Sequence, residues 1–291
     1  MRFIKALFLP ITTTLDFTQK YFKSLVFIVI LFLIIPNTTD KNSLMKPNLA
    51  RIDLSGPIID ANKIVEDIEK LKKNDNIKGV LFVVNSPGGA VSPSIEIAMA
   101  IKSLVEKKPV IAYATGTMAS GSYYASIWAN KIIANPGSVI GSIGVIFQSV
   151  NMKELVNKIG IKEQTVYAGK YKTVGSVFRD WKEFEKEEIQ TLIDDTYNLF
   201  VKDVASARGL NINQKTDFAD AHIYIAHKAK KVGLIDDIGS MSKAKKELVK
   251  LSKVLVPKWK KRNKVDRIID KIISETTTKI SSMFFGLKAV L

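Results

Sequence analysis

The chain has 291 residues, a hydrophobic content of 46% and a formal net charge of +16, enough to bury the core of one large domain or two small ones. It contains no cysteine, which excludes disulfides and thiolate metal sites, and the sequence predicts neither a metal nor a cofactor. Residues 250–291 carry 11 basic and 3 acidic side chains, half of the surplus, so a nucleic-acid groove spread over the fold is not expected.

The first predicted element is an uncharged apolar run from Ser24 to Pro36, preceded by basic residues. A helix of this length rises about 20 Å, less than the roughly 30 Å of a hydrocarbon core, but Tyr21 and Phe22 extend it. No small-residue cleavage site follows, so we expect an uncleaved membrane anchor rather than a removed signal peptide. The run is not amphipathic, which argues against a buried core helix.

The basic residues before this run also predict its orientation. They place the N-terminus in the cytoplasm and the body of the chain on the extracytoplasmic side of a bacterial inner membrane, as a single-pass protein.

From residue 49 to about residue 239 strand-like and helix-like segments alternate, which is typical of an α/β domain. The apolar run 77–84 predicts a buried parallel strand that ends in the turn 85–89, and helical spacing predicts a helix over 95–105. A second strand is predicted at 110–114, then a small-residue turn at 115–121 and a helix from Ser120 to about Trp128. Both turns follow neighbouring strands, where α/β proteins build their sites.

Beyond residue 239 the chain becomes rich in Lys, Ile and Thr, with a basic cluster at 258–264 and apolar residues at helical spacing after it. This tail is expected to be a solvated helix, to lie on an anionic membrane surface or to pack on a neighbouring subunit. The predicted organisation is 1–48 as cytoplasmic segment, anchor and linker, 49–240 as the main domain and 241–291 as a basic amphipathic tail.

Ser120 is the candidate nucleophile, because the residues around it are small enough for a substrate backbone to approach. At the start of a helix its hydroxyl lies near the positive end of the dipole, and the N–H of Gly121 is free to face an oxyanion. Gly88 or Gly89, in a Pro-Gly-Gly turn, could supply a second N–H. The alternative is that Ser120 packs a helix on the sheet and the glycines form an ordinary tight turn.

The chain has only two histidines, His222 and His227, about a hundred residues further on, so a lysine base is favoured over the usual histidine. A lysine base must be the neutral amine, which requires burial and few nearby carboxylates. Lys172 fits because residues 168–176 contain no acid. Lys170 is a rival that spacing does not separate, and either lysine could be an ordinary surface charge.

Ser142 lies in a glycine-bracketed turn and could orient the lysine amine through its hydroxyl, or could simply form the turn.

Five short motifs now occur in one order within residues 49–240, at positions 85–89, 119–124, 134–137, 141–145 and 171–179. In order and spacing they resemble the signal peptide peptidase A family. The resemblance implies an α/β, Clp protease/crotonase-like fold of repeated ββα units and a Ser-Lys endopeptidase domain at 49–240 that degrades released signal peptides in or near the bilayer. It implies the following roles: Ser120 as nucleophile, Lys172 as base, Ser142 as lysine-orienting hydroxyl, and Gly121 with Gly88 or Gly89 as oxyanion donors.

The resemblance also implies partners. Family members form homo-oligomeric rings or domes, and a single subunit of this size would leave its cleft open to water. The small side chains around the site indicate apolar, small-residue peptide substrates, and the anchor would restrict them to segments near the lipid bilayer.

The sequence departs from the family pattern at three places. Ser122 replaces a second glycine, which would narrow the cleft or offer another nucleophile, although the Ala-Ser-Gly register favours Ser120. Val177 replaces a common proline, and residues 220–226 lack the usual two glycines and arginine. These last changes do not touch the dyad, so His222 and His227 are expected to be structural.

Two other classes of protein stay open. A crotonase-type acyl-CoA enzyme shares the oxyanion turn, but the apolar N-terminal run and the acid-free surroundings of the Ser-Lys pair argue against it. The second is a non-catalytic membrane scaffold of the same fold, and Ser122 in place of the usual glycine is a sign that the sequence has changed from the catalytic pattern.

Overall fold

The computed structural model describes residues 19–24, 26–27 and 46–261. The chain divides into two units, Met1–Lys46 and Pro47–Leu291. The described residues of the first unit before residue 28 are helical, and no helix in the described part of the chain is both long and apolar enough to cross a membrane. Residues 25 and 28–36 of the predicted anchor, and the tail from residue 262, lie outside the described residues.

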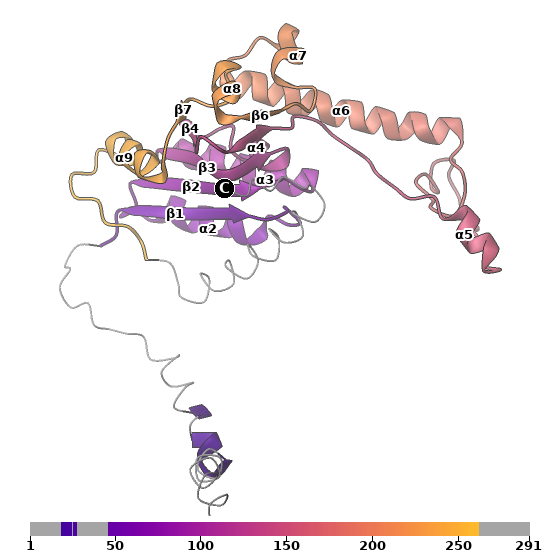
Figure 1. The fold of residues 1–291 in the computed structure, drawn as a ribbon, viewed down its shortest axis with the longest axis horizontal. Coiled ribbons are helices and arrows are strands. Elements are labelled where there is room, and N and C mark those ends of the chain that lie inside the picture. The colour runs from indigo at the N-terminus through magenta and orange to yellow at the C-terminus, as the bar shows by residue number, and fades with distance from the viewer. Residues whose placement is uncertain (1–18, 25, 28–45, 262–291) are drawn as a thin grey trace, which may run out of the picture. The chain divides into compact units, whose positions relative to one another are not determined.

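The second unit is built on a sheet whose central strands are all parallel, in the order β1-β2-β3-β4-β7 (Figure 1). These strands are β1 Leu49–Ser55, β2 Gly79–Ser86, β3 Val110–Ala119, β4 Lys131–Ala134 and β7 Asp237–Ile238. Two short strands leave this path, β5 Val139–Gly141 and β6 Ile223–Ile225. β5 pairs parallel with the end of β3 and antiparallel with β6.

Helices cover both faces of the sheet, which is why β2 is buried along nearly its whole length. α2 Asn62–Lys73 and α3 Val91–Val105 pack on one face and form the larger core with β1, β2 and β3. α9 Met241–Leu251 packs on the other face through Ala244 and Leu248 (Figure 1). The predicted α/β class is therefore confirmed, and so are a strand and a helix at the expected places, although β2 lies two residues later than the predicted 77–84 and α3 begins four residues before the predicted 95–105.

Each of β1, β2 and β3 is followed by a single helix. Within the described residues, the repeat of two strands and a helix that the resemblance implied is seen only at β4 and β5, between α4 Gly121–Tyr124 and α5 Lys153–Lys158.

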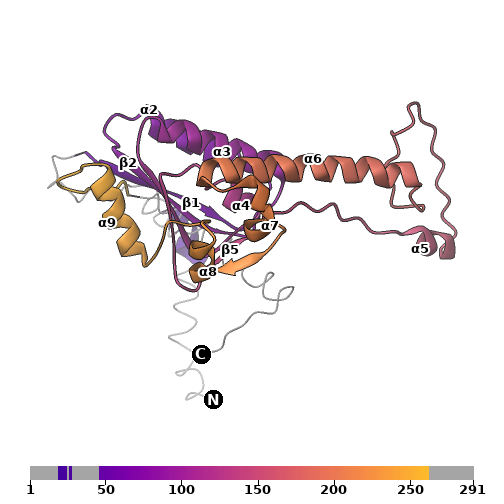
Figure 2. The same cartoon turned by 90° about the horizontal axis from the view of Figure 1, so that it is seen from above.

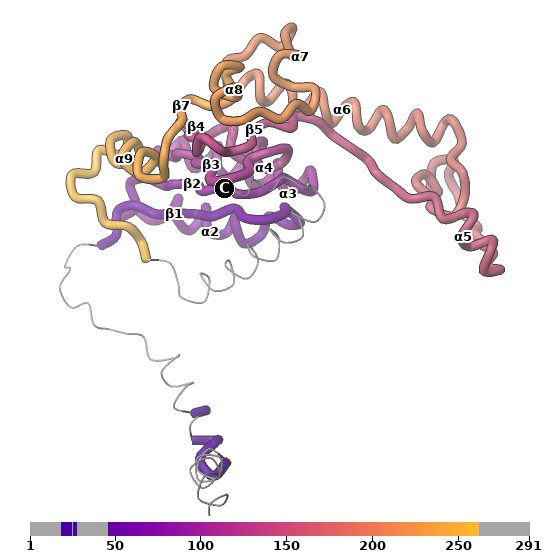
Figure 3. The backbone as a smooth tube through the Cα atoms, viewed as in Figure 1, coloured from indigo at the N-terminus to yellow at the C-terminus, as the bar shows by residue number. Residues whose placement is uncertain are grey.

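After β5 the chain leaves the sheet, and we call residues 142–182 the arm. The arm runs outward, contains α5, and returns through the long helix α6 Glu183–Arg208 (Figures 2 and 3). The C-terminal half of α6 joins the larger core through residues 200–205, and the helix ends where Gly209 adopts a left-handed conformation, φ 64°. Three short helical elements, η1 Ile212–Gln214, α7 Lys215–Phe218 and α8 Ala226–Lys231, complete the fold around β6.

The predicted turn at 115–121 and the predicted helix at 120–128 are wrong in extent. β3 continues to Ala119 because residues 117–119 pair with β5, and because the side-chain oxygen of Asn85 accepts the N–H of Thr117 at 3.0 Å. α4 stops at Tyr124, since the N–H groups of Ser126 and Ile127 bond three residues back instead of four. A one-turn helix has a weak dipole, so individual N–H groups matter more here than the helix as a whole.

Candidate active site

Ser120 lies in a sharp turn between the end of β3 and α4. Its backbone has φ 52° and ψ −128°, a conformation that is strained for a residue with a side chain. The turn is held because the Ser120 N–H donates to the carbonyl of Gly141 at 2.8 Å and its carbonyl accepts the N–H of Tyr124 at 3.0 Å. The hydroxyl makes no hydrogen bond within the described residues, so it is free to react. Strand, strained serine and helix form the arrangement that exposes a nucleophile in many hydrolases.

The two glycine turns press against each other beside this serine. A Cβ on Gly88 would lie 2.6 Å from the nitrogen of Gly121 and 2.8 Å from the Cβ of Ser120, so only glycine fits there. The N–H of Gly88 donates to the hydroxyl of Ser86 at 3.2 Å. The N–H groups of Gly89 and Gly121 have no acceptor among the described residues. Of the two predicted choices, Gly89 is therefore the one free to act with Gly121.

These groups open into an apolar cavity of about 990 Å³. Ser120, Ser142, Gly89 and Gly121 all line it, and so do larger apolar side chains, among them Val91, Ile95, Tyr124, Ile193, Leu199 and Phe200. A cavity of this size and lining would hold several side chains of an extended apolar peptide.

Ser142 is placed in the cavity by a second strained turn, with φ 52°. Its N–H donates to the carbonyl of His222 at 2.7 Å, and the N–H of Ala221 donates to the carbonyl of Ile143 at 2.9 Å. Residues 220–222, where the sequence departs from the family pattern, thus hold Ser142 in place through backbone hydrogen bonds. The side chain of His222 stays outside this cavity and packs on the ring of Tyr224, with centroids 5.9 Å apart.

Ser122 is fully buried and does not line the cavity. Its hydroxyl bonds to backbone groups of Ala119 and Ser86. The prediction that its side chain narrows the cleft is therefore wrong, and a buried hydroxyl engaged in this way is unsuited to be a nucleophile.

Lys172 lies in the arm, exposed, and is not among the described residues that line the cavity. Its neighbour Tyr171 packs edge-on against Phe184 at the start of α6, with ring centroids 5.5 Å apart. Tyr124 of α4 packs on Phe200 of the same helix at 4.9 Å. From residue 184 to residue 200 is 16 residues of helix, or about 24 Å along its axis. Within one chain the segment carrying Lys172 is thus remote from the candidate nucleophile, and the Ser-Lys dyad stays a prediction.

Lys170, the rival lysine, is occupied in the arm. Its ammonium lies 4.5 Å from the ring centre of Phe184 and 4.9 Å from that of Tyr171. At these distances the Lys170 ammonium makes cation–π contacts with both rings, so its charge contributes to local packing. The ammonium of Lys172 makes no such contact, hydrogen bond or ion pair within the described residues, so the structure distinguishes the two lysines where spacing did not.

Arg179 stabilises the arm through contacts that the sequence interpretation did not predict. Its guanidinium forms a two-pronged ion pair with Glu185, at 2.6 and 2.7 Å, and also donates to the hydroxyl and carbonyl of Thr173 at 2.8 and 3.1 Å. Glu185 is buried and accepts the N–H of Lys182, and the pair holds the pKa of Glu185 down at about 2. Since Thr173 follows Lys172 directly, Arg179 ties the lysine-bearing loop to the start of α6.

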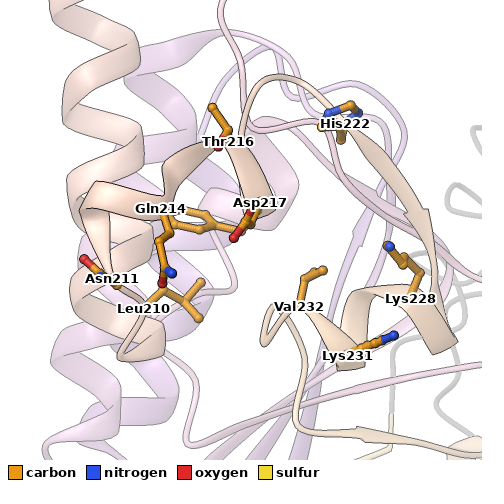
Figure 4. Close-up of a pocket in the computed structure, with 10 residues that line it drawn as sticks. Leu210, Asn211, Gln214, Thr216, Asp217, His222, Lys228, Lys231 and Val232 are labelled. Atoms are coloured by element: carbon orange, nitrogen blue, oxygen red, sulfur yellow. The ribbon is translucent and has the colours of Figure 1, made fainter.

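A smaller cavity of about 520 Å³ lies near α7 and α8. Leu210, Asn211 and Gln214 line one side and Lys228 and Lys231 the other (Figure 4). None of the predicted catalytic residues is in its described lining.

Comparison with known proteins identifies the family of the chain. The family model of Peptidase family S49 matches residues 102–255, just over half of the chain. The chain belongs to Peptidase family S49. The model of the Clp protease family matches residues 43–139. The resemblance drawn from the five motifs is thus confirmed.

Three relatives illustrate the similarity. A "Putative protease" of Methanocaldococcus jannaschii is 44% identical over 68% of this chain and 64% of its own length. A "Putative protease" of Synechocystis is 34% identical over 69% of this chain and 73% of its own length. A "Putative signal peptide peptidase SppA" of Enterococcus faecium is 35% identical over 64% and 55%. The match thus spans less than two thirds of the first and third relatives. The family and these relatives support a serine-type protease.

Among solved structures, a mutant of ClpP1 from Listeria monocytogenes is similar with a TM-score of 0.47 and 18% identity, over 67% of this chain and 93% of that one.

Proposed function

We propose that this S49 chain is a serine endopeptidase in which Ser120 attacks the substrate and the N–H groups of Gly89 and Gly121 bind the oxyanion. The observation that carries the proposal is the strained Ser120, with a free hydroxyl beside two free N–H groups in one apolar cavity. The strain supports it because costly backbone conformations are retained where geometry serves a reaction.

The base in this proposal is Lys172, supplied by a neighbouring copy of the chain. Its side chain is exposed on the arm, and its neighbour Tyr171 packs on Phe184, about 24 Å along the helix from Phe200, which packs on Tyr124 beside the nucleophile. A second copy would bury the amine, and burial favours the neutral form that a base requires. Ser142, already in the cavity, is the hydroxyl that would orient the incoming amine.

The reaction is acyl transfer. The Lys172 amine takes the proton of the Ser120 hydroxyl while Oγ bonds to the peptide carbonyl carbon, and the resulting oxyanion accepts two backbone N–H bonds. As the C–N bond breaks, the lysine ammonium returns its proton to the leaving amine. Water then attacks the acyl-enzyme with the same base, which releases the acid and regenerates Ser120.

The substrate proposed is an apolar peptide segment near a membrane, with released signal peptides as the natural class. The apolar lining of the cavity supports this choice. The same proposal keeps the chain as a single-pass inner-membrane protein with its catalytic domain on the extracytoplasmic side, anchored by residues 24–36, and assembled as a homo-oligomer.

The test uses the full-length chain and an apolar peptide that carries a fluorophore and a quencher. Ser120→Ala and Lys172→Ala should each reduce cleavage at least 1000-fold, while Lys170→Ala, the matched control, should retain it. A fluorophosphonate probe should label wild type and Lys170→Ala at Ser120, should not label Ser120→Ala, and should label Lys172→Ala much more slowly because the base that activates the serine is missing. Cleavage that survives in Ser120→Ala would reject the proposal, and turnover of an acyl-CoA thioester in place of the peptide would favour the crotonase-type alternative.

The shared site has its own test. Ser120→Ala and Lys172→Ala chains, each inactive alone, should recover activity when they are unfolded together and reassembled, because a mixed pair joins one intact serine to one intact lysine. If the mixture stays inactive while reassembled wild type recovers, Lys172 does not act from a second copy.

A further inference from the structure

Ser122 has a buried hydroxyl that the mechanism above does not use. Its Oγ accepts the N–H of Ala119 at 2.9 Å and lies 2.6 Å from the carbonyl oxygen of Ser86. The carbonyl of Ala119 is a second acceptor at 2.9 Å. One hydroxyl has one proton to donate, so the shorter contact, to Ser86, is the principal one. The hydroxyl thus connects the residue before the nucleophile with the residue before the Pro-Gly-Gly turn.

This connection lies at the point where β2 and β3 stop pairing. Pairing between β2 and β3 shifts register after Val84, and its last pair is Ser86 with Met118. Beyond that pair both chains turn away. The Ser122 hydroxyl therefore bridges the Ala119 N–H and the Ser86 carbonyl at the last pair of the ladder. Since all three residues are buried, loss of the hydroxyl would remove a hydrogen-bond acceptor of the Ala119 N–H and a donor to the Ser86 carbonyl where water cannot replace them.

The two segments joined in this way carry the two oxyanion donors, Gly89 and Gly121. Stabilisation of an oxyanion depends on donors held at a fixed separation before the reaction begins. We propose that Ser122 is a positioning residue. By fixing one turn to the other, it sets the separation of the Gly89 and Gly121 N–H groups, a role that rests on the proposed peptidase function.

The experiment compares Ser122→Ala with Ser126→Ala in the full-length chain. Ser126 is equally buried and donates its hydroxyl to the backbone carbonyl of Ser122 at 2.8 Å, but its side chain makes no hydrogen bond to either glycine turn within the described residues. With the quenched apolar peptide, Ser122→Ala should lower kcat about 10–100-fold and leave KM within about twofold, because the hole acts on the transition state. Ser126→Ala should keep its kcat.

A peptide aldehyde of the same sequence provides the second readout. It bonds reversibly to Ser120 and places an oxyanion in the hole, so its inhibition constant should rise in Ser122→Ala by the factor lost in kcat/KM. Loss of packing alone would lower the midpoint of thermal unfolding without moving the aldehyde and the rate together. Ser122→Cys, which keeps a weak donor and acceptor, should fall between wild type and alanine, and serves if the alanine variant does not fold.

The outcomes separate this inference from the function beneath it. If Ser120→Ala is inactive but Ser122→Ala matches Ser126→Ala in kcat and aldehyde affinity, the positioning role is overturned and the peptidase stands. If Ser120→Ala remains active, both are overturned.

Discussion

Replacing Arg179 by glutamine removes the cation from a buried carboxylate, and the cost can be worked from the structure. Glu185 is 1% exposed and its pKa is lowered from an ordinary value of 4.5 to about 2, first by the hydrogen bonds from Arg179 and then by the N–H of Lys182. That difference corresponds to about 3 kcal/mol between the two ionisation states. Because the arginine is 30% exposed, solvent screens part of it. We expect Arg179→Gln to lower the free energy of unfolding by about 2 kcal/mol at pH 7.

The stability difference between wild type and Arg179→Gln should depend on pH, and its direction follows from the lowered pKa of Glu185. A carboxyl whose pKa is depressed in the folded state contributes stability above its unfolded pKa and loses it as the pH falls through the folded value. The difference between wild type and Arg179→Gln should therefore be full at pH 7 and shrink between about pH 4.5 and pH 2. Urea unfolding followed by tryptophan fluorescence at several pH values measures it. Arg179→Lys, which keeps the charge but not the two-pronged geometry, should fall in between.

An unchanged stability at pH 7, or a loss of the same size at pH 7 and pH 3, would refute this reasoning. The same variant releases Thr173, so its peptide cleavage should also decrease if the adjacent Lys172 is the base.

Two further predictions concern the glycine turns. Because Ser120 has φ 52°, Ser120→Gly should be more stable than Ser120→Ala by about 1 kcal/mol, the reverse of the usual order, and urea midpoints that place alanine above glycine would contradict the strain. A Cβ on Gly89 would lie 2.1 Å from the carbonyl oxygen of Ile58, whereas one on Gly137 would be 3.6 Å from its nearest neighbour. Gly89→Ala should therefore cost roughly 2 kcal/mol or more and abolish probe labelling of Ser120, while Gly137→Ala should change neither, and equal behaviour of the two variants would show that the Gly89 turn tolerates a side chain.

What could be predicted from the sequence is what nearby residues determine. The apolar run 77–84 and the helical spacing at 95–105 are local signals, and both elements formed as expected. The end of β3 was missed because Asn85, some thirty residues earlier, and β5, some twenty residues later, hold residues 117–119 as a strand. No pattern inside 115–121 carries that information.

Ser122 shows the same limit at the level of one side chain. The sequence places a hydroxyl two residues after the nucleophile, but its direction depends on the turn angle at Ser120 and on α4 ending after one turn. Those two features bury it against Ser86 instead of pointing it into the cavity. The role of Glu185 at the start of α6 was closer to being predictable, because a glutamate at the third helical position is a recognised capping signal. The spacing could not predict that Arg179 donates hydrogen bonds to both Glu185 and Thr173.

The sequence around Lys172 suits a catalytic base, but its position in a single chain does not. Its acid-free surroundings suit a neutral amine, yet in a single chain it is exposed, and water stabilises the ammonium form. The arm around it also exposes apolar side chains that a stable surface would bury, among them Ile146, Val150 and Val166. One contact with a second copy would cover these side chains, desolvate the amine and bring it to a serine. Burial of the arm and assembly of the dyad are then the same event, and an arm variant such as Val166→Asp should lose assembly and cleavage together while its Ser120 cavity stays intact.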